Sequence, residues 1–388
     1  MNSEIRSVVV GTGFIGPVHV EALRRAGVCV AGIVGSSPEK SRAAAETLGL
    51  PDAFKTLDDV LSDPTVDCVH LTTPNRFHFP QAAAVLKAGK HVICEKPLAM
   101  NSAESAELVQ IAADSGRAAA VAYNIRFYPL CHEAAARVRN GSIGKVIHIN
   151  GSYVQDWLLR QNDFNWRVLA ADGGELRAVA DIGTHWLDLI QFISGDKIVS
   201  VCADLRTVYP TRQRPIGNVE TFSGGPSAET PTESVEITTE DCGAVMFRMA
   251  GGANGCLWVS QTTAGKKNCL RFELGGSEQS LAWNSESPNT LEIGNRDQPN
   301  QSLIRDPALM DASAATIANY PGGHNEGFPD SFKQLFRTVY GCIRSGEFAA
   351  TSEHAPALFP TFADGHREIL ICEAILNSHR RRGWVDVN

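Results

Sequence analysis

Hydrophobic and polar positions follow two periods in the first third of the chain. Short continuous apolar runs, such as Ser7-Val8-Val9-Val10, indicate strands buried on both faces. Between them lie longer stretches that are typical of helices. The predicted strands cover 7–10, 28–34, 66–71, 91–94 and 118–122, and the predicted helices cover 15–26, 38–48, 56–62, 77–88 and 102–115. This alternation predicts an α/β fold with a doubly wound parallel sheet.

The pattern changes near Tyr123. A helix predicted over 129–140 ends at Asn140-Gly141, a C-cap signal. The strands that follow are longer and partly alternate apolar with polar residues, as in an antiparallel sheet with one buried face. They cover 145–156, 197–209, 234–240, 243–250, 254–263 and 268–275, and helices over 327–345 and 361–380 come after them. Two segments, 210–233 and 284–324, give no assignment, and loops of that length are usually functional or mobile.

Composition excludes several classes of protein. The 388 residues carry a net charge of −8, with 43% hydrophobic and 20% charged residues, as in a soluble globular enzyme of two or three domains. Without a basic surface, neither nucleic acid nor an anionic membrane is expected as a partner. No apolar run is long enough to span a bilayer, and because the N-terminus leads directly into a predicted strand, no signal peptide is expected. The ten cysteines occur singly, which indicates reduced thiols in a cytoplasmic protein.

A glycine motif follows the first predicted strand and opens the first predicted helix. In Gly11-Thr12-Gly13-Phe14-Ile15-Gly16, the first glycine permits a tight turn and the second lets the backbone approach a pyrophosphate. The third lets helix and strand pack closely, and the helix N-terminus favours phosphate. In this strand-turn-helix context we expect a dinucleotide, contacted by Gly11, Gly13, Phe14, Ile15 and Gly16.

The end of the second predicted strand bears on the choice of dinucleotide. NAD preference usually comes from a carboxylate at this position, but here the residue is Gly35. The hydroxyls of Ser36 and Ser37, with Lys40 and Arg42, could meet a 2′-phosphate. We therefore expect NADP in preference to NAD. The alternative is that the basic residues only solvate the next helix and both cofactors are accepted.

Two further segments carry candidate chemistry. Glu95-Lys96-Pro97 follows a buried strand at the sheet edge where ligands bind in open α/β folds. A lysine there can stabilise a developing alkoxide, although a solvated turn explains the spacing equally well. Asp181 and His185 are four apart on a predicted helix over 179–190, so both project from one face and can orient a substrate and exchange a proton. A structural hydrogen bond or half of a metal site are the alternatives, and no cluster with ligand spacing favours a metal.

Together these motifs resemble the glucose–fructose oxidoreductase / inositol dehydrogenase / rhizopine catabolism family. Ala122-Tyr123-Asn124-Ile125-Arg126-Phe127 is similar to the family's link into its second domain, Gly141-Ser142-Ile143-Gly144-Lys145-Val146 to its turn into the large sheet, and Gly383-Trp384-Val385-Asp386-Val387 to its ending. The resemblance covers nearly the whole chain. It implies a Rossmann domain, placed here at 1–124, and an α/β domain with an open, mostly antiparallel sheet at 125–388, whose C-terminal helices can pack back on the first domain.

The resemblance also implies roles for individual residues. Lys96 would contact the reacting hydroxyl, Asp181 would bind a substrate hydroxyl, and His185 would accept the proton. Thr73-Pro74-Asn75 resembles the family's turn beside the cofactor, and Glu95 the neighbour of the nicotinamide ribose. The cofactor contacts expected outside the glycine motif are therefore Ser36, Ser37, Lys40, Thr73, Pro74, Asn75, His78, Glu95 and Lys96, with no metal.

The implied substrate is a carbohydrate or polyol, oxidised at a secondary hydroxyl with NADP or NAD. Residues that combine flat apolar faces with hydrogen-bonding groups suit a sugar ring, although the tryptophans could equally belong to the core. The candidates are Tyr153, Gln155, Asp156, Trp157, Trp166 and Arg167, with His324 in a glycine-rich turn that either closes the pocket or lies at the surface. Gly151-Ser152-Tyr153-Val154-Gln155-Asp156-Trp157 resembles the subgroup acting on anhydrosugars and glycosides.

Other functions stay open within the same family. The fold also serves glycosidases that retain NAD for transient oxidation, and a non-catalytic NADP-binding co-regulator. A structural protein would require none of the three residues Lys96, Asp181 and His185. The family further implies a homodimer or homotetramer.

Overall fold

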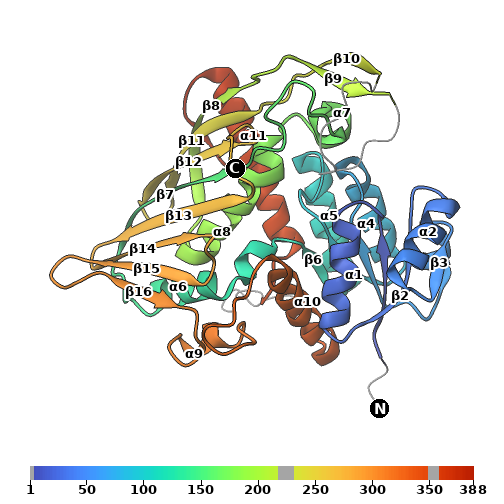
Figure 1. Ribbon diagram of the computed structural model, residues 1–388, viewed down its shortest axis with the longest axis horizontal. Helices are drawn as coiled ribbons and strands as arrows, with labels where there is room; N and C mark the ends of the chain where they lie inside the picture. Colours follow the sequence, from blue (N-terminus) through green and yellow to red (C-terminus); the bar gives the residue numbers. More distant parts are fainter. Residues whose placement is uncertain (1–3, 217–230, 348–357) are drawn as a thin grey trace. The chain divides into compact units, whose positions relative to one another are not determined.

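The computed structural model describes residues 4–216, 231–347 and 358–388. These residues form two compact units (Figure 1). The first unit holds the described residues of 4–123 and of 332–369. The second unit holds the described residues of 124–219, 223–331 and 370–388.

The first unit is built on a six-stranded parallel sheet in the order β3-β2-β1-β4-β5-β6. Its strands are β1 (Arg6–Val10), β2 (Cys29–Val34), β3 (Asp52–Phe54), β4 (Cys68–Leu71), β5 (His91–Cys94) and β6 (Ala119–Val121). The connecting helices are α1 (Ile15–Arg25), α2 (Pro38–Leu48), α3 (Leu57–Ser62), η1 (Asn75–Phe77), α4 (His78–Lys87) and α5 (Ser102–Ser115). The strand order reverses between β1 and β4, and such a switch point is where open α/β sheets bind ligands.

Distant parts of the chain complete the first unit. Helix α10 (Phe328–Ser345) contributes Phe332 and the residues after it, and α11 (Phe362–Arg381) contributes its first eight residues. The Val121 amide donates to the Pro360 carbonyl at 2.9 Å, which continues the sheet past β6. The N-terminal Rossmann sheet therefore depends on C-terminal residues of the chain.

The second unit contains a nine-stranded sheet in the order β16-β15-β14-β13-β7-β12-β11-β8-β17. Among the described strands, β7 and β12 form its one parallel pair. The strands are β7 (Val146–Val154), β8 (Ile198–Arg206), β11 (Cys242–Met249), β12 (Asn254–Ser260), β13 (Cys269–Gly276), β14 (Gln279–Asn284), β15 (Thr290–Asn295), β16 (Gln301–Ile304) and β17 (Val385–Asp386). A separate ribbon pairs β9 (Thr211–Pro215) with β10 (Thr232–Glu236).

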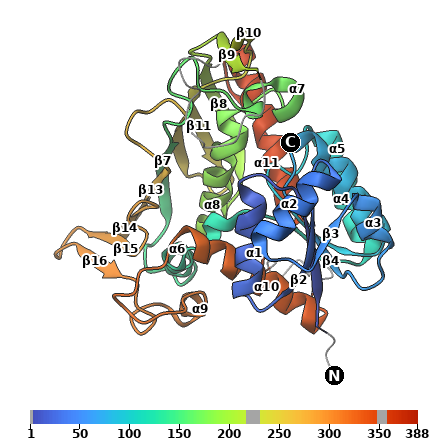
Figure 2. The ribbon, with the colours of Figure 1, turned by 45° about the vertical axis from the view of Figure 1, so that its right-hand side comes forward.

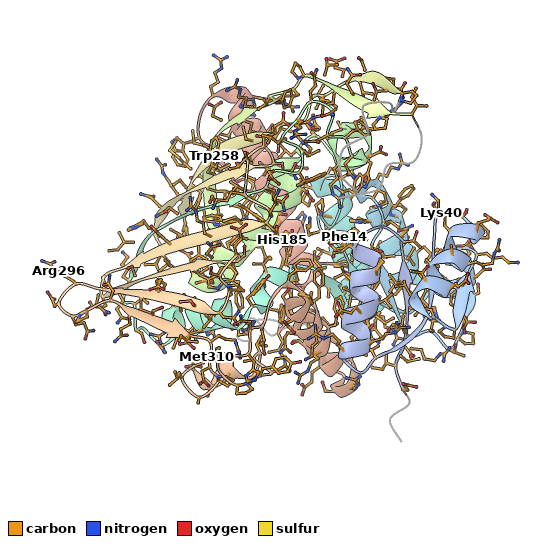
Figure 3. The ribbon with its side chains drawn as sticks, viewed as in Figure 1. Phe14, Lys40, His185, Trp258, Arg296 and Met310 are labelled. Carbon is orange, nitrogen blue, oxygen red and sulfur yellow. The ribbon has the colours of Figure 1, made fainter. Side chains whose placement is uncertain are left out.

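Helices cover one face of the nine-stranded sheet (Figure 2). They include α6 (Pro129–Arg139), which follows η2 (Asn124–Phe127), and α8 (Thr184–Ser194). Trp186 of α8 is fully buried against the sheet, and its indole N–H donates to the Arg271 carbonyl at 2.9 Å. No helix of the described residues lies on the opposite face, where Trp258 is 47% exposed (Figure 3). This sheet is apolar on one side and open on the other.

The predicted fold class is confirmed, with three corrections in the second unit. Segment 284–324, for which the sequence pattern predicts no element, contains β15, β16 and α9 (Ala312–Ala315). The expected strand over 234–240 ends at Glu236, and it pairs with β9 instead of joining the large sheet. Within 210–233, residues 217–230 lie outside the described part of the chain.

The helix predicted over 179–190 has two parts. It begins as a π-helical turn, η4 (Val179–Gly183), and continues as α8. The expectation of one regular α-helix from 179 is therefore wrong at its first turn. Asp181 lies in the π-turn and His185 in the first turn of α8, and π-turns inside helices often mark functional sites.

Candidate functional site

The glycine turn after β1 is shaped by close contacts inside the first unit. Gly11 has φ +120°, and a Cβ there would lie 2.4 Å from the Thr72 hydroxyl. A Cβ on Gly16 would lie 2.2 Å from the Gly11 carbonyl oxygen, so both positions require glycine to pack. At Gly13, by contrast, a Cβ would meet no atom within 4 Å. The backbone is bare there, on the side from which a pyrophosphate can approach.

The helix that follows this turn is uncapped. The residue before α1 is Phe14, whose side chain accepts no hydrogen bond from the first turn. The side chains of Ser37 and Asn101 cap α2 and α5. A helix N-terminus without a side-chain cap, beside a bare glycine, is suited to phosphate oxygens. The residues present therefore fit a dinucleotide, and Phe14 is 49% exposed beside them (Figure 3).

The end of β2 explains why no carboxylate stands at Gly35. A Cβ there would lie 2.9 Å from both Cβ of Lys40 and the amide nitrogen of Ser41. The Gly35 amide also donates to the Ser41 hydroxyl at 2.8 Å. Because α2 packs so closely against this position, a group that reads the ribose must come from the following residues. Of these, Ser36 and Lys40 are exposed.

His78 connects the loops that follow β4 and β5. Its Nδ1 lies 2.7 Å from the Pro97 carbonyl oxygen and its Nε2 lies 2.8 Å from that of Thr73. The imidazole is buried and its two ring nitrogens bind these loops, and the expected contact of His78 with the cofactor stays a prediction. Thr73 is also fixed by its own hydroxyl, which donates to Gln81 at 2.7 Å. The loop that carries Lys96 is therefore tied through His78 to the loop that carries Thr73.

The second unit brings together part of the predicted substrate site. The Asp181 carboxylate accepts a hydrogen bond from the Gln261 side-chain amide at 2.8 Å, and Arg167 Nε lies 3.3 Å from its other oxygen. The ring centroids of Tyr153 and His185 are 6.3 Å apart. Asp181 is thus held by a hydrogen bond from Gln261, which was not anticipated from the sequence, and by the ion pair with Arg167.

A second group of side chains surrounds the end of β7. The Tyr153 hydroxyl and the Gln155 amide donate to Asn268 Oδ1 at 2.7 and 2.8 Å, and the Trp157 indole donates to Gln155 at 2.7 Å. Burial raises the pKa of the Tyr153 phenol above its ordinary value, so the phenol stays protonated. Asn268 joins this network without having been singled out in the sequence.

Three other predicted substrate residues have separate surroundings. Trp166 is covered by the Arg167 guanidinium, 4.5 Å from the ring centroid. Asp156 pairs with Lys267 at 2.8 Å. His324 is exposed, and its carbonyl accepts a hydrogen bond from Arg305, a buried residue that also binds the Pro321 carbonyl at 3.0 Å. The turn around His324 is therefore shaped by a guanidinium beneath it.

A buried charged cluster supports the beginning of the Asp181–His185 helix. The Glu240 carboxylate accepts hydrogen bonds from the amides of Arg177 (2.9 and 3.0 Å) and Val179 (2.8 Å), at the start of η4. The next residue, Asp241, pairs with Arg177 and with Arg212, the latter at 2.6 Å. Burial opposes the charge on Asp241, yet the two guanidiniums hold its pKa below the usual range. No sequence motif had indicated these residues.

Within the described parts of the chain, no three His, Cys, Asp or Glu side chains converge into a possible metal site. None of the helices in those parts has the length and hydropathy to cross a membrane.

Comparison with known proteins assigns both units to one family of oxidoreductases. The family model described as "Oxidoreductase family, NAD-binding Rossmann fold" matches residues 5–123, and the "GFO/IDH/MocA C-terminal domain" model matches residues 131–282. A levoglucosan dehydrogenase from Pseudarthrobacter phenanthrenivorans is 30% identical over 92% of this chain and 88% of that protein.

Solved structures agree over nearly the full length. Levoglucosan dehydrogenase in complex with NADH and levoglucosan has a TM-score of 0.86 at 27% identity, covering 99% of each chain. An inositol dehydrogenase homolog complexed with NAD⁺, from Azotobacter vinelandii, has a TM-score of 0.84 at 25% identity, covering 98% of this chain and 97% of that one. The family predicted from the sequence motifs is confirmed: the chain belongs to the GFO/IDH/MocA oxidoreductases, with an N-terminal NAD-binding Rossmann fold.

Proposed function

We propose that this oxidoreductase transfers a hydride between nicotinamide and a secondary hydroxyl of a sugar, glycoside, anhydrosugar or polyol. The observation that carries the proposal is the arrangement around Asp181, whose carboxylate is held by Arg167 and Gln261 on a turn adjoining that of His185. A fixed acceptor next to an imidazole suits a substrate with neighbouring hydroxyls. The relatives named for levoglucosan and inositol act on such compounds, which supports the same substrate class here.

Each residue has a distinct role in the proposed reaction. Asp181 accepts a hydrogen bond from one substrate hydroxyl and so fixes the ring. His185 takes the proton of the reacting hydroxyl as its C–H bond breaks, and the Lys96 ammonium stabilises negative charge on that oxygen. Bound nicotinamide supplies the hydride acceptor. Tyr153, Gln155 and Trp157 present a hydrogen-bonded wall to the sugar, whereas Trp166 offers an apolar face.

The test is reduction of NAD or NADP, followed by absorbance, with a panel of anhydrosugars, glycosides, free sugars and inositols. We expect Lys96→Ala and His185→Ala each to lower turnover by about 10²- to 10⁴-fold and to leave cofactor affinity within about threefold. Wild-type turnover in either variant would disprove the assigned role. If cofactor copurifies with the protein and no compound causes net reduction of NAD or NADP, the proposed function would be a glycosidase that retains its NAD and not a dehydrogenase.

We further propose that the Rossmann unit prefers NADP. Steric crowding at Gly35 supports this, because it keeps a carboxylate from that position, and the exposed Ser36 and Lys40 can meet a 2′-phosphate. Arg42 is engaged by Glu39 at 3.0 Å and contributes less. Ser36→Asp should weaken NADPH binding at least about tenfold while NADH binding holds or improves. Equal NADH and NADPH affinities in the unmodified protein would reject the preference.

We also propose a cytoplasmic homodimer or homotetramer. None of the ten cysteines forms a disulfide, as expected in a reducing compartment. The open face of the nine-stranded sheet exposes Met246, Trp258 and Trp384, which supports contact with a second copy. Light scattering after size exclusion measures the assembly, and a monomer at micromolar concentration would contradict it.

A further inference from the structure

A continuous chain of hydrogen bonds crosses the interior of the first unit. Ser7 Oγ lies 2.5 Å from Tyr340 Oη, which lies 2.9 Å from His70 Nε2. His70 Nδ1 lies 3.0 Å from His19 Nδ1, and His19 Nε2 lies 3.0 Å from Glu95 Oε1. These groups come from β1, α10, β4, α1 and the loop after β5, and all but Glu95 are fully buried.

Proton positions along this chain are constrained by its ends. If Glu95 is ionised, its oxygen can only accept, so His19 must carry its proton on Nε2. His19 Nδ1 is then an acceptor, which requires a proton on His70 Nδ1. His70 Nε2 must in turn accept from the Tyr340 hydroxyl. Every donor then points towards Glu95, with both imidazoles neutral.

The surroundings favour a neutral His70. Burial, together with the neighbouring His19, holds the pKa of His70 well below its usual value. Phe336 packs edge-on against both imidazoles, with ring centroids 4.9 Å from His19 and 4.7 Å from His70. The other ionisable groups nearby are Cys68 and Arg344 beside Tyr340, and Cys94, His78 and Lys96 beside Glu95. Burial raises the pKa of Cys68 to about 12, so this thiol adds no negative charge.

The far end of the chain closes in the protein interior. Ser7 and Tyr340 are both 0% exposed, so no proton can pass from their hydroxyls to water. Aligned donors in a medium of low dielectric instead polarise one another and stabilise a negative charge at the end they point to. That end is Glu95, whose second oxygen accepts a hydrogen bond from the Lys96 amide at 3.2 Å.

We propose that Ser7, Tyr340, His70 and His19 form a buried relay that keeps Glu95 ionised and fixed, and through Glu95 sets the position of Lys96. The relay residues are positioning residues. They act on the loop that presents Lys96, and their effect on turnover rests on the proposed dehydrogenase function. Their effect on Glu95 is independent of that function, because it changes the binding of any ligand that contacts this loop.

The experiment measures the dissociation constant of NADH by fluorescence between pH 5.5 and 8. His19→Gln keeps a donor where Nε2–H stood, whereas His19→Leu removes it. Without that donor the buried Glu95 takes up a proton at higher pH, so NADH affinity in His19→Leu should fall about tenfold towards pH 5.5. The unmodified protein and His19→Gln should stay within about threefold across the same range.

Tyr340→Phe gives an independent reading from the opposite end. It keeps the ring stacked on His70 but removes the hydroxyl, three hydrogen bonds from Glu95. The relay predicts a smaller weakening in the same pH direction, and this variant decides the question if His19→Leu does not fold. Flat pH profiles in both variants would overturn the relay and leave these residues as core packing. NADH binding needs no sugar, so a failed substrate search would not affect the outcome.

Discussion

Replacing Asp241 with asparagine should destabilise the second unit strongly. The Asp241 carboxylate is fully buried between the guanidiniums of Arg177 and Arg212, which are themselves fully buried. Asparagine is nearly isosteric, so packing is preserved while two cations lose their shared anion. Breaking a buried ion pair from one side typically costs about 3–5 kcal/mol. We expect a loss of free energy of unfolding in that range.

The assay follows from the placement of the tryptophans. All six lie between Trp157 and Trp384, in the second unit, so their fluorescence reports its unfolding alone. With an m-value of about 2–3 kcal/mol/M, the urea midpoint should fall by about 1–2.5 M. Asp204→Asn is the matched control, because Asp204 is 97% exposed and its loss should leave the midpoint unchanged. Equal midpoints for the two variants would refute the reasoning.

The same substitution predicts a pH dependence. The pKa of Asp241 in the folded state lies below its ordinary 3.8, against the effect of burial, because Arg177 and Arg212 favour the anion. Its stabilising contribution is therefore complete above 3.8 and is lost as the pH falls through the lower folded value. The gap between the unmodified protein and Asp241→Asn should stay constant from pH 7 to pH 5 and narrow below pH 4. A gap that widens on acidification would contradict this sign.

Three further predictions concern the two halves of the site. Gly13→Ala should fold normally but weaken NADH binding at least about tenfold. Gly16→Ala should instead lower the melting temperature, because its Cβ would overlap a carbonyl oxygen. A lower melting temperature in Gly13→Ala than in Gly16→Ala would refute the packing argument. Arg167→Met should raise KM for the sugar about tenfold without changing NADH affinity, since Asp181 loses the ion pair that orients it. Arg305→Met should speed cleavage of the turn above it several-fold by a protease of broad specificity such as proteinase K, and unchanged cleavage would show that the turn holds its own shape.

Local signals account for the parts of the fold that were predicted to the residue. Helix α5 begins after Asn101, whose side chain accepts from the Glu104 amide, and ends before Gly116 at φ +58°. Both signals are visible in the sequence without any tertiary information. Strands such as β15 have no such markers. Thr290–Asn295 is recognised as a strand because its partners on either side are present, and those pairings cannot be read from one segment.

The candidate site divides in the same way. Gly11, Lys96, Asp181 and His185 stood out through motif and spacing. Gln261 could not be found by such means. It comes close to the substrate residues because β12 runs parallel to β7, so that the two strands end together. That pairing joins segments about a hundred residues apart, and sequence periodicity carries no information about it.

The first unit is formed by segments that lie far apart in the sequence, and this has a consequence for synthesis on the ribosome. Residues up to Tyr123 emerge first, but Phe332, Phe336 and Tyr340, which pack on His19 and His70, come more than two hundred residues later. At about 5–20 residues per second, this interval lasts about 10–40 s. During that time the nascent Rossmann sheet lacks its aromatic cover, while residues 124–331 are being made. The chain should consequently depend on chaperones most while the second unit is being made, and its N-terminal fragment alone should aggregate.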